Sequence, residues 1–257
     1  MVIGSDIFKK YFEPFSGNYI IIGGTACDII IEEAGFTPRA TKDIDIVLIV
    51  EALSKEFVQH FWQFIHDGRY ERNEKNTGDR KYYRFMDPDD KSFPKQVELF
   101  SRKPDLVDLD EPAYLTPIPV DDDLSSLSAI LMDGDYYSFM IDHSELHDGL
   151  NIAKIEALIC LKAKAFLEIK KRIEGGGTEN SRHFRKHKMD IFRLVVMLPE
   201  DTGFELPGSI KSDLQEFANE VAGDLPDPAI FIEMGLGRIE PEKVFSQLVK
   251  SFKLTIQ

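Results

Sequence analysis

Two acidic side chains lie two residues apart in a strongly apolar segment of the sequence. Asp43 and Asp45 alternate with isoleucine residues, a pattern that predicts a β-strand carrying both. Side chains two residues apart in a strand point to the same face, so the two carboxylates are expected side by side. Like charges that close raise each other's cost of ionisation unless a cation lies between them. The pair therefore indicates a divalent metal site, with an ordinary acidic strand face as the alternative.

A glycine turn precedes this pair. Residues 19–22 predict a short buried strand, and Gly23 and Gly24 then allow a sharp turn and the close approach of a ligand. The next ten residues predict a helix with Thr25 as its N-cap and Gly35 as its left-handed stop. The start of such a helix offers backbone N–H groups and a positive dipole end, which suit phosphate. The same glycines would also serve a turn that only packs.

A third carboxylate follows on a later strand. Glu98 is the single acid of the apolar segment Gln96–Phe100, which predicts a short strand. It is the natural third ligand beside Asp43 and Asp45. Three further acids that follow closely, and could be mistaken for it, are Asp105, Asp108 and Asp110.

These residues together resemble a known family. Three short motifs follow one another along the chain: Gly23-Gly24-Thr25, Asp43-Ile44-Asp45 and Val97-Glu98-Leu99. In their types and order, these motifs resemble those of the nucleotidyltransferase superfamily of the DNA polymerase β type. The AbiEii-like abortive-infection and toxin branch is most similar in its local pattern, Gly-Gly-Thr-Ala followed by Arg39-Ala-Thr41-Lys-Asp43-Ile-Asp45. The resemblance covers about residues 18–198.

The resemblance implies a site and a reaction. In that superfamily, the glycine turn holds a triphosphate, and three carboxylates hold magnesium ions that activate a hydroxyl and stabilise the leaving pyrophosphate. It therefore implies Mg²⁺ or Mn²⁺ held by Asp43, Asp45 and Glu98, and an NTP bound at Gly23, Gly24 and Thr25. Many relatives have Ser where this chain has Gly24, and we expect Thr25 to replace that hydroxyl.

A lysine in the second half of the sequence falls within the apolar side of a predicted helix. Ile152–Lys171 predicts one helix with an apolar stripe, and Lys162 falls in the middle of that stripe at 100° per residue. A buried ammonium must pair with an anion, lower its pKa or extend out along its stem. One interpretation is such an extension or a salt bridge to an acid of the sheet. The other is that Lys162 binds the β- or γ-phosphate of the nucleotide.

The family resemblance favours the second interpretation and adds an aspartate. Leu161-Lys162-Ala163 and the later segment 186–194 are similar to a helix lysine and a basic, Asp, hydrophobic, Leu motif of the AbiEii type. Asp190 matches the aspartate of that motif, although Lys186-His187 replaces the usual Lys-Asp pair. Asp190 is expected either to orient Lys162 or to act on substrate. The alternative is an ordinary ion pair with Arg193 or Lys186.

Composition limits the class of protein and its partners. The chain has 257 residues, 43% of them hydrophobic, enough for one large or two small domains. With no 18-residue apolar run, no signal-peptide pattern and only Cys27 and Cys160, the sequence predicts a cytoplasmic protein with no membrane association. A net charge of −14 disfavours general attraction to RNA, but residues 151–200 hold 11 basic and 6 acidic residues. Any polynucleotide would have to bind at that basic segment. The alternative interpretation of the segment is a solvated surface turn without a partner.

The expected architecture is an α/β (α+β) nucleotidyltransferase core with a mixed sheet flanked by helices, followed by a helical C-terminal part. We predict a catalytic core over 1–150 and a helical region over 151–257 that completes the nucleotide cleft. A β-hairpin is expected at Asp133-Gly134, between strands over 125–132 and 136–142.

The expected activity is transfer of a nucleoside monophosphate from an NTP to a hydroxyl. By analogy with relatives, RNA such as tRNA is a candidate acceptor, and the chain is a candidate toxin with an antitoxin partner. A protein or a small molecule is a further candidate acceptor. The alternative is a nucleotide sensor or interaction protein that keeps the fold without catalysis.

Overall fold

The computed structural model describes residues 3–39, 41–70, 83–100, 130, 133–176 and 182–256, and contains two compact units. Unit 1 comprises Met1–Asp28, Ala40–Asp121 and Met140–Ala153, and unit 2 comprises Ile29–Arg39, Asp122–Phe139 and Lys154–Gln257. In the described ranges, no helix is both long and apolar enough to cross a membrane. The predicted boundary at residue 150 stays a prediction.

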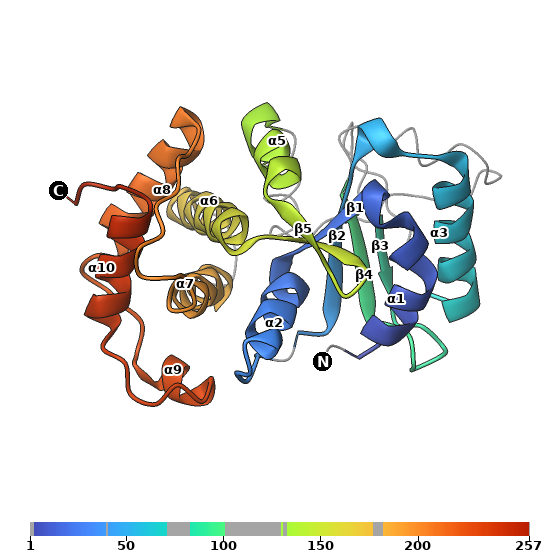
Figure 1. Ribbon diagram of the computed structural model, residues 1–257, viewed down its shortest axis with the longest axis horizontal. Helices are drawn as coiled ribbons and strands as arrows, with labels where there is room; N and C mark the ends of the chain where they lie inside the picture. Colours follow the sequence, from blue (N-terminus) through green and yellow to red (C-terminus); the bar gives the residue numbers. More distant parts are fainter. Residues whose placement is uncertain are drawn as a thin grey trace. The chain divides into compact units, whose positions relative to one another are not determined.

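Unit 1 is built around a mixed β-sheet (Figure 1). Among the described residues the sheet has six strands in the order β3-β4-β2-β1-β6-β5. The strands are β1 (Tyr19–Ile22), β2 (Asp43–Leu48), β3 (Tyr83–Met86), β4 (Gln96–Phe100), β5 (Ser144–His147) and β6 (Leu150–Ala153). The β2–β4 and β1–β6 pairs are parallel, whereas the other neighbours are antiparallel. The expected mixed α/β class is confirmed.

Aromatic side chains form much of the core of unit 1. They come from α1 (Ser5–Phe12), α3 (Lys55–Gly68) and the sheet, and the short 3-10 helices η1 (Glu13–Asn18) and η2 (Val50–Ala52) complete the connections. Phe12 contacts the rings of Tyr19, Phe57 and Phe64, mostly edge to face, a geometry that adds to the burial of apolar area. These helices fix the strands whose ends carry the acidic residues.

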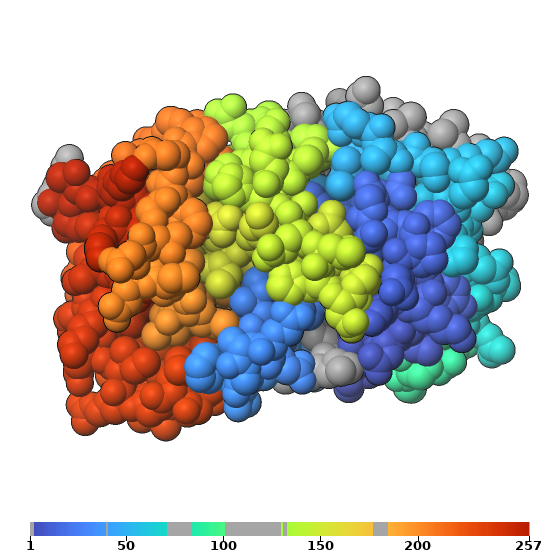
Figure 2. All heavy atoms as spheres, in the orientation of Figure 1, coloured from blue at the N-terminus to red at the C-terminus, as the bar shows by residue number. Residues whose placement is uncertain are grey.

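Unit 2 contains the C-terminal helices. They are α6 (Ile155–Glu174), α7 (Arg182–Val195), α8 (Gly208–Val221), α9 (Ala229–Glu233) and α10 (Pro241–Ser251). In Figure 2 the segments after α7, coloured orange to red, form one continuous surface of this unit. The central helix α6 is buried over most of its circumference, including Lys162, because α7 and α8 both pack on it. The helical C-terminal part expected from the sequence is therefore present.

Two element boundaries differ from the prediction. Helix α2 (Gly23–Glu33) begins at Gly23, so Thr25 lies inside the first turn and is not the N-cap. Gly35 does have the expected left-handed conformation, with φ +81°. Ile152 belongs to strand β6 and α6 begins only at Ile155, because residue 152 pairs with β1 as part of the sheet.

The hairpin predicted at Asp133-Gly134 is wrong. Residues 136–142 belong to helix α5 (Gly134–Asp142), because the Asp133 carboxylate accepts hydrogen bonds from the backbone N–H groups of Asp135 and Tyr136, at 2.8 and 3.4 Å, as an N-cap does. The Asp-Gly hairpin turn lies instead at Asp148-Gly149, between β5 and β6, where both residues have positive φ. Apart from Ile130, the strand predicted over 125–132 lies outside the described residues.

Candidate functional site

The three predicted acids lie on neighbouring strands of unit 1. Strand β2 carries Asp43 and Asp45, and β4 runs parallel to it with Glu98 directly opposite Asp45. In parallel strands, opposite residues point to the same face of the sheet, so Glu98 and the two aspartates share one face. The three acids that the sequence predicts as metal ligands therefore lie on one face of the sheet, with Glu98 next to Asp45.

Glu98 is buried and strongly constrained. Its Oε1 accepts a hydrogen bond from Arg84 Nε of β3 at 2.9 Å and another from the Gln96 side chain. Burial, followed by the charge of Asp45, raises the pKa of Glu98 well above its usual value, although Arg84 acts in the opposite direction. The structure therefore concentrates negative charge at this point and provides one cation close to it.

The glycine turn lies directly against these carboxylates. Gly23 has φ +69°, and a Cβ added there would lie 1.8 Å from Asp45 Oδ2. A Cβ at Gly24 would lie 2.5 Å from Thr41 Oγ1. Both glycines are therefore required by their surroundings, since any side chain at Gly23 would displace the carboxylate and one at Gly24 would displace Thr41.

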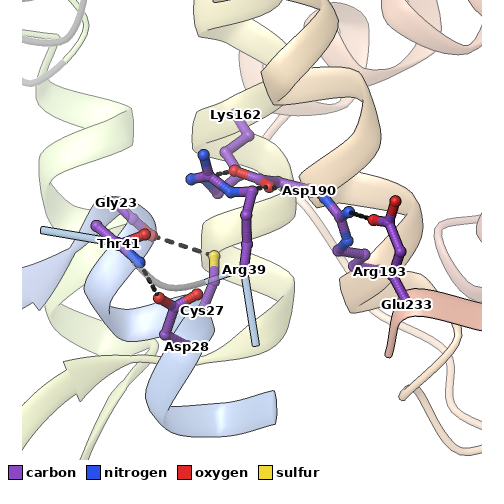
Figure 3. Close-up of polar contacts among 9 residues, drawn as sticks. All are labelled: Gly23, Cys27, Asp28, Arg39, Thr41, Lys162, Asp190, Arg193 and Glu233. Atoms are coloured by element: carbon purple, nitrogen blue, oxygen red, sulfur yellow. Dashed lines mark hydrogen bonds and ion pairs between the residues drawn. The ribbon is translucent and has the colours of Figure 1, made fainter. Parts of the chain in front are cut away.

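Thr25 and Thr41 both have contacts around the glycine turn, and the expected role of Thr25 at the nucleotide stays a prediction. The buried Thr25 hydroxyl donates a hydrogen bond to the backbone carbonyl of Asp43, so it ties α2 to the start of β2. Thr41, rather than Thr25, places its hydroxyl against the Gly24 backbone. Asp28 accepts a hydrogen bond from the Thr41 backbone N–H at 2.6 Å, which holds this loop in place (Figure 3).

The side-chain oxygens of the three acids indicate which metal ion this site could bind. Carboxylate oxygens are the ligands that Mg²⁺ and Mn²⁺ prefer, and Glu98 lies directly opposite Asp45 on the neighbouring strand. Across the described ranges, no group of three or more His, Cys, Asp or Glu side chains is arranged so that it could hold a metal ion. Mg²⁺ sites commonly use one or two carboxylates together with substrate phosphates, so the donor set fits a metal that arrives with a nucleotide.

A second cluster of charged side chains lies in unit 2. Lys162 of α6 is 5% exposed, and its Nζ is 2.9 Å from Asp190 Oδ2 of α7. The lysine therefore pairs with an acid of the neighbouring helix and does not extend to solvent. Burial opposes ionisation of Asp190, but Lys162 and Arg39 outweigh it and hold the pKa of Asp190 at about 2.

Two arginines share the other oxygen of Asp190 (Figure 3). Arg39 Nε lies 3.3 Å and Arg193 Nη1 3.6 Å from Oδ1. Arg193 also donates to Glu233 through Nη2 at 3.0 Å. The expected i, i+3 pair with Arg193 is therefore present, in addition to the pair with Lys162. We define the cation cluster as Arg39, Lys162 and Arg193 around Asp190.

Sequence reasoning missed three of these residues. Asp28 could have been found as a lone acid in the apolar helix segment 26–31, and Arg39 as a cation placed four residues before Asp43. Arg84 gave no signal, because its pairing with Glu98 depends on the β3–β4 register. The predicted alternatives to Glu98 at 105, 108 and 110 lie outside the described residues.

No family model, curated protein or solved structure matches the chain.

Proposed function

We propose that this protein is a metal-dependent nucleotidyltransferase of the DNA polymerase β type, similar to the AbiEii-like branch. The observation that carries the proposal is the shared face of Asp43, Asp45 and Glu98, with the Gly23 backbone against Asp45. The left-handed turn at Gly23 places the first turn of α2, with its backbone N–H groups, next to one of these carboxylates, which supports a phosphate site beside the acids.

Each predicted site residue would have a separate role in the reaction. Asp43, Asp45 and Glu98 would hold Mg²⁺ or Mn²⁺ together with the phosphates of the nucleotide, because the three carboxylates by themselves are not arranged as a metal site. The metal, when bound, would supply activation of the acceptor hydroxyl and stabilisation of the leaving pyrophosphate. The N-terminal turn of α2 would bind phosphate through its backbone N–H groups.

Other residues would position these groups. Lys162 would bind the β- or γ-phosphate as a point charge; in the structure, its partner is Asp190. Arg84 and Gln96 fix one oxygen of Glu98 and so direct the carboxyl group toward Asp45.

The acceptor and partners extend the same proposal. RNA, such as the end of a tRNA, is the acceptor suggested by the AbiEii-like resemblance, and the basic segment 151–200 is the part of this acidic chain that suits it. The same resemblance suggests a toxin held by an antitoxin protein. Two features support a cytoplasmic setting. One is the proposed use of an NTP, and the other is that Cys27 and Cys160 are buried free thiols.

A transfer assay tests the proposal. The protein is incubated with each labelled NTP, total RNA, and Mg²⁺ or Mn²⁺, and label in RNA, protein and small molecules is measured. We expect transfer from at least one NTP, and Asp45→Asn to lower the rate at least a hundredfold. Asp89→Asn, at an exposed acid of the β3–β4 loop, should leave the rate unchanged.

One observation favours the alternative of a nucleotide-binding protein without transfer. Glu98 already has Arg84 as a counter-charge, as a carboxylate in a purely structural ion pair would. A metal-dependent rise of the melting temperature with NTP, lost in Asp45→Asn and unaccompanied by transfer to any acceptor, would support that alternative. Transfer that persists in the double variant Asp43→Asn, Asp45→Asn would refute the proposed mechanism.

A further inference from the structure

We propose that Asp190 is a stand-in anion in the cation cluster, and that Arg39 is a second phosphate-binding residue that exchanges Asp190 for a terminal phosphate of the nucleotide. The inference rests on the proposed function for the identity of the ligand, a nucleoside triphosphate. It assigns a binding role to Arg39, for which the sequence indicated none.

The contacts of Asp190 are the first step of the argument. A carboxylate has two oxygens, and Oδ2 accepts a hydrogen bond from Lys162 at 2.9 Å. Oδ1 is shared by Arg39 and Arg193, at 3.3 and 3.6 Å. Both distances exceed the 2.7–2.9 Å that is usual for charge-assisted hydrogen bonds. Both of these contacts to Oδ1 are therefore longer than an optimal charge-assisted hydrogen bond.

The two arginines differ in how firmly they are held. Arg193 is 6% exposed and is fixed by Glu233, yet its buried Nη1 makes no hydrogen bond within the described residues. A buried N–H without an acceptor costs about 1–3 kcal/mol. An additional anion with more acceptor oxygens than a carboxylate would satisfy it. Arg193 therefore provides a fixed donor directed at the position next to Asp190 Oδ1.

Arg39 is the most exposed member of the cluster. Its side chain is 28% exposed, against 6% for Lys162, and it follows the end of α2 in the loop that precedes β2. A guanidinium group binds phosphate through two parallel hydrogen bonds, which suits exchange from a poorly placed carboxylate oxygen. Arg39 can therefore turn from Asp190 to a phosphate while Lys162 stays in place.

The burial of the cation cluster favours a terminal phosphate over a backbone phosphodiester. Lys162 and Asp190 are almost fully enclosed, so a small terminal phosphate is a better fit than a backbone phosphodiester flanked by two sugars. A terminal phosphate also carries more negative charge and three acceptor oxygens. The geometry thus favours the triphosphate of a nucleotide over the backbone of RNA.

Binding of tripolyphosphate without metal tests the inference. Affinity is measured by calorimetry in EDTA for the full chain and its variants. We expect Arg39→Gln to weaken binding at least tenfold and Arg39→Lys to weaken it less. Arg238→Gln, at an exposed arginine of unit 2, is the matched control and should bind as the unmodified chain does.

The stand-in role of Asp190 has its own signature. Asp190→Asn removes the competing anion, so tripolyphosphate should bind severalfold more tightly, and addition of tripolyphosphate should raise the melting temperature of this variant more than that of the unmodified chain. A residue that merely supports the structure would give weaker binding in both Asp190→Asn and Arg39→Gln. Weaker or equal binding in Asp190→Asn would overturn the stand-in role.

The remaining outcomes also decide the question. Unchanged affinity in Arg39→Gln would overturn the role of Arg39, whether or not Asp190→Asn folds. A short RNA without terminal phosphates that displaces tripolyphosphate would overturn the choice of ligand. Because EDTA removes divalent metal, binding that persists while the transfer assay fails would refute the proposed function and leave the phosphate site intact.

Discussion

At the scale of single residues, the buried acids Asp190 and Glu98 differ in the direction in which their surroundings shift the pKa. Asp190 has cationic neighbours close enough to keep it ionised despite its burial, and its pKa falls to about 2. Glu98 has Arg84 as a partner, but burial and, after it, the charges of Asp45 and Asp43 raise its pKa. Buried charge is stable only where paired, so unit 1 retains a repulsion that adds nothing to stability and is typical of a functional site.

Replacing Glu98 by glutamine tests this repulsion. The pKa of Glu98 is higher in the folded than in the unfolded chain, so its contribution to stability is greatest below its usual value of 4.5 and is lost as pH rises through the raised pKa. We expect Glu98→Gln to increase the free energy of unfolding at pH 7 by about 1 kcal/mol, because the amide keeps the hydrogen bonds without the charge.

The measurement is urea unfolding of both proteins at pH 4 and pH 7. The difference should disappear at pH 4, where Glu98 is protonated in the folded chain. Asp89→Asn, which removes an exposed acid of unit 1, should change stability by less than about 0.5 kcal/mol at either pH. A Glu98→Gln protein that is less stable at pH 7 would contradict the interpretation.

At the scale of elements, the junction between α2 and β2 places the glycine turn beside the acids. The Thr25 hydroxyl binds the Asp43 carbonyl, the Asp28 carboxylate binds the Thr41 backbone, and Thr41 covers Gly24. These contacts run from helix to strand and from helix to loop, so the position of the turn depends on side chains rather than on a continuous element.

Substitution of Gly23 should break this junction. We expect Gly23→Ala to lower the free energy of unfolding by about 1–3 kcal/mol, because alanine disfavours positive φ and its methyl group would overlap Asp45. Thermal unfolding measures the change. In Gly208→Ala the added methyl group meets no atom within 4 Å, at the first position of α8, and stability should be unchanged or slightly higher. Equal melting temperatures for Gly23→Ala and the unmodified chain would show that the turn is not so constrained.

At the scale of the whole molecule, the chain passes repeatedly between the two units. Unit 1 and unit 2 each contain three separate segments of sequence, and the residues of α2 are divided between them at Asp28 and Ile29. Neither unit can therefore be cut out as one continuous piece of chain. We expect the two units to unfold together.

The two cysteines report on this cooperativity. Cys27 lies in unit 1 and Cys160 in unit 2, and both are buried, with burial raising the pKa of the Cys160 thiol. In the single-cysteine variants Cys27→Ala and Cys160→Ala, the remaining thiol should react with a disulfide reagent at similar slow rates, because each needs the same unfolding event. In guanidinium chloride both should react as free thiols. Native rates that differ more than tenfold would show that the units open independently.

Local patterns were sufficient where neighbours in sequence decide the structure. The alternation around Asp43 and Asp45 predicted β2, the single acid between apolar residues predicted β4, and the apolar stripe predicted a buried Lys162. Prediction failed at Asp133-Gly134, because the same dipeptide suits a helix start and a hairpin turn, and only packing of the following residues separates the two.

The sequence by itself determined the mixed α/β class, the strands that carry the three acids and the helix that carries Lys162, because periodicity and turn chemistry are local properties. Only the tertiary structure decided that Glu98 lies opposite Asp45, that Arg84 is its partner, and that Asp190 is shared by three cations. These contacts join residues distant in the chain. Strand register and helix packing set their distances, and no local pattern encodes either.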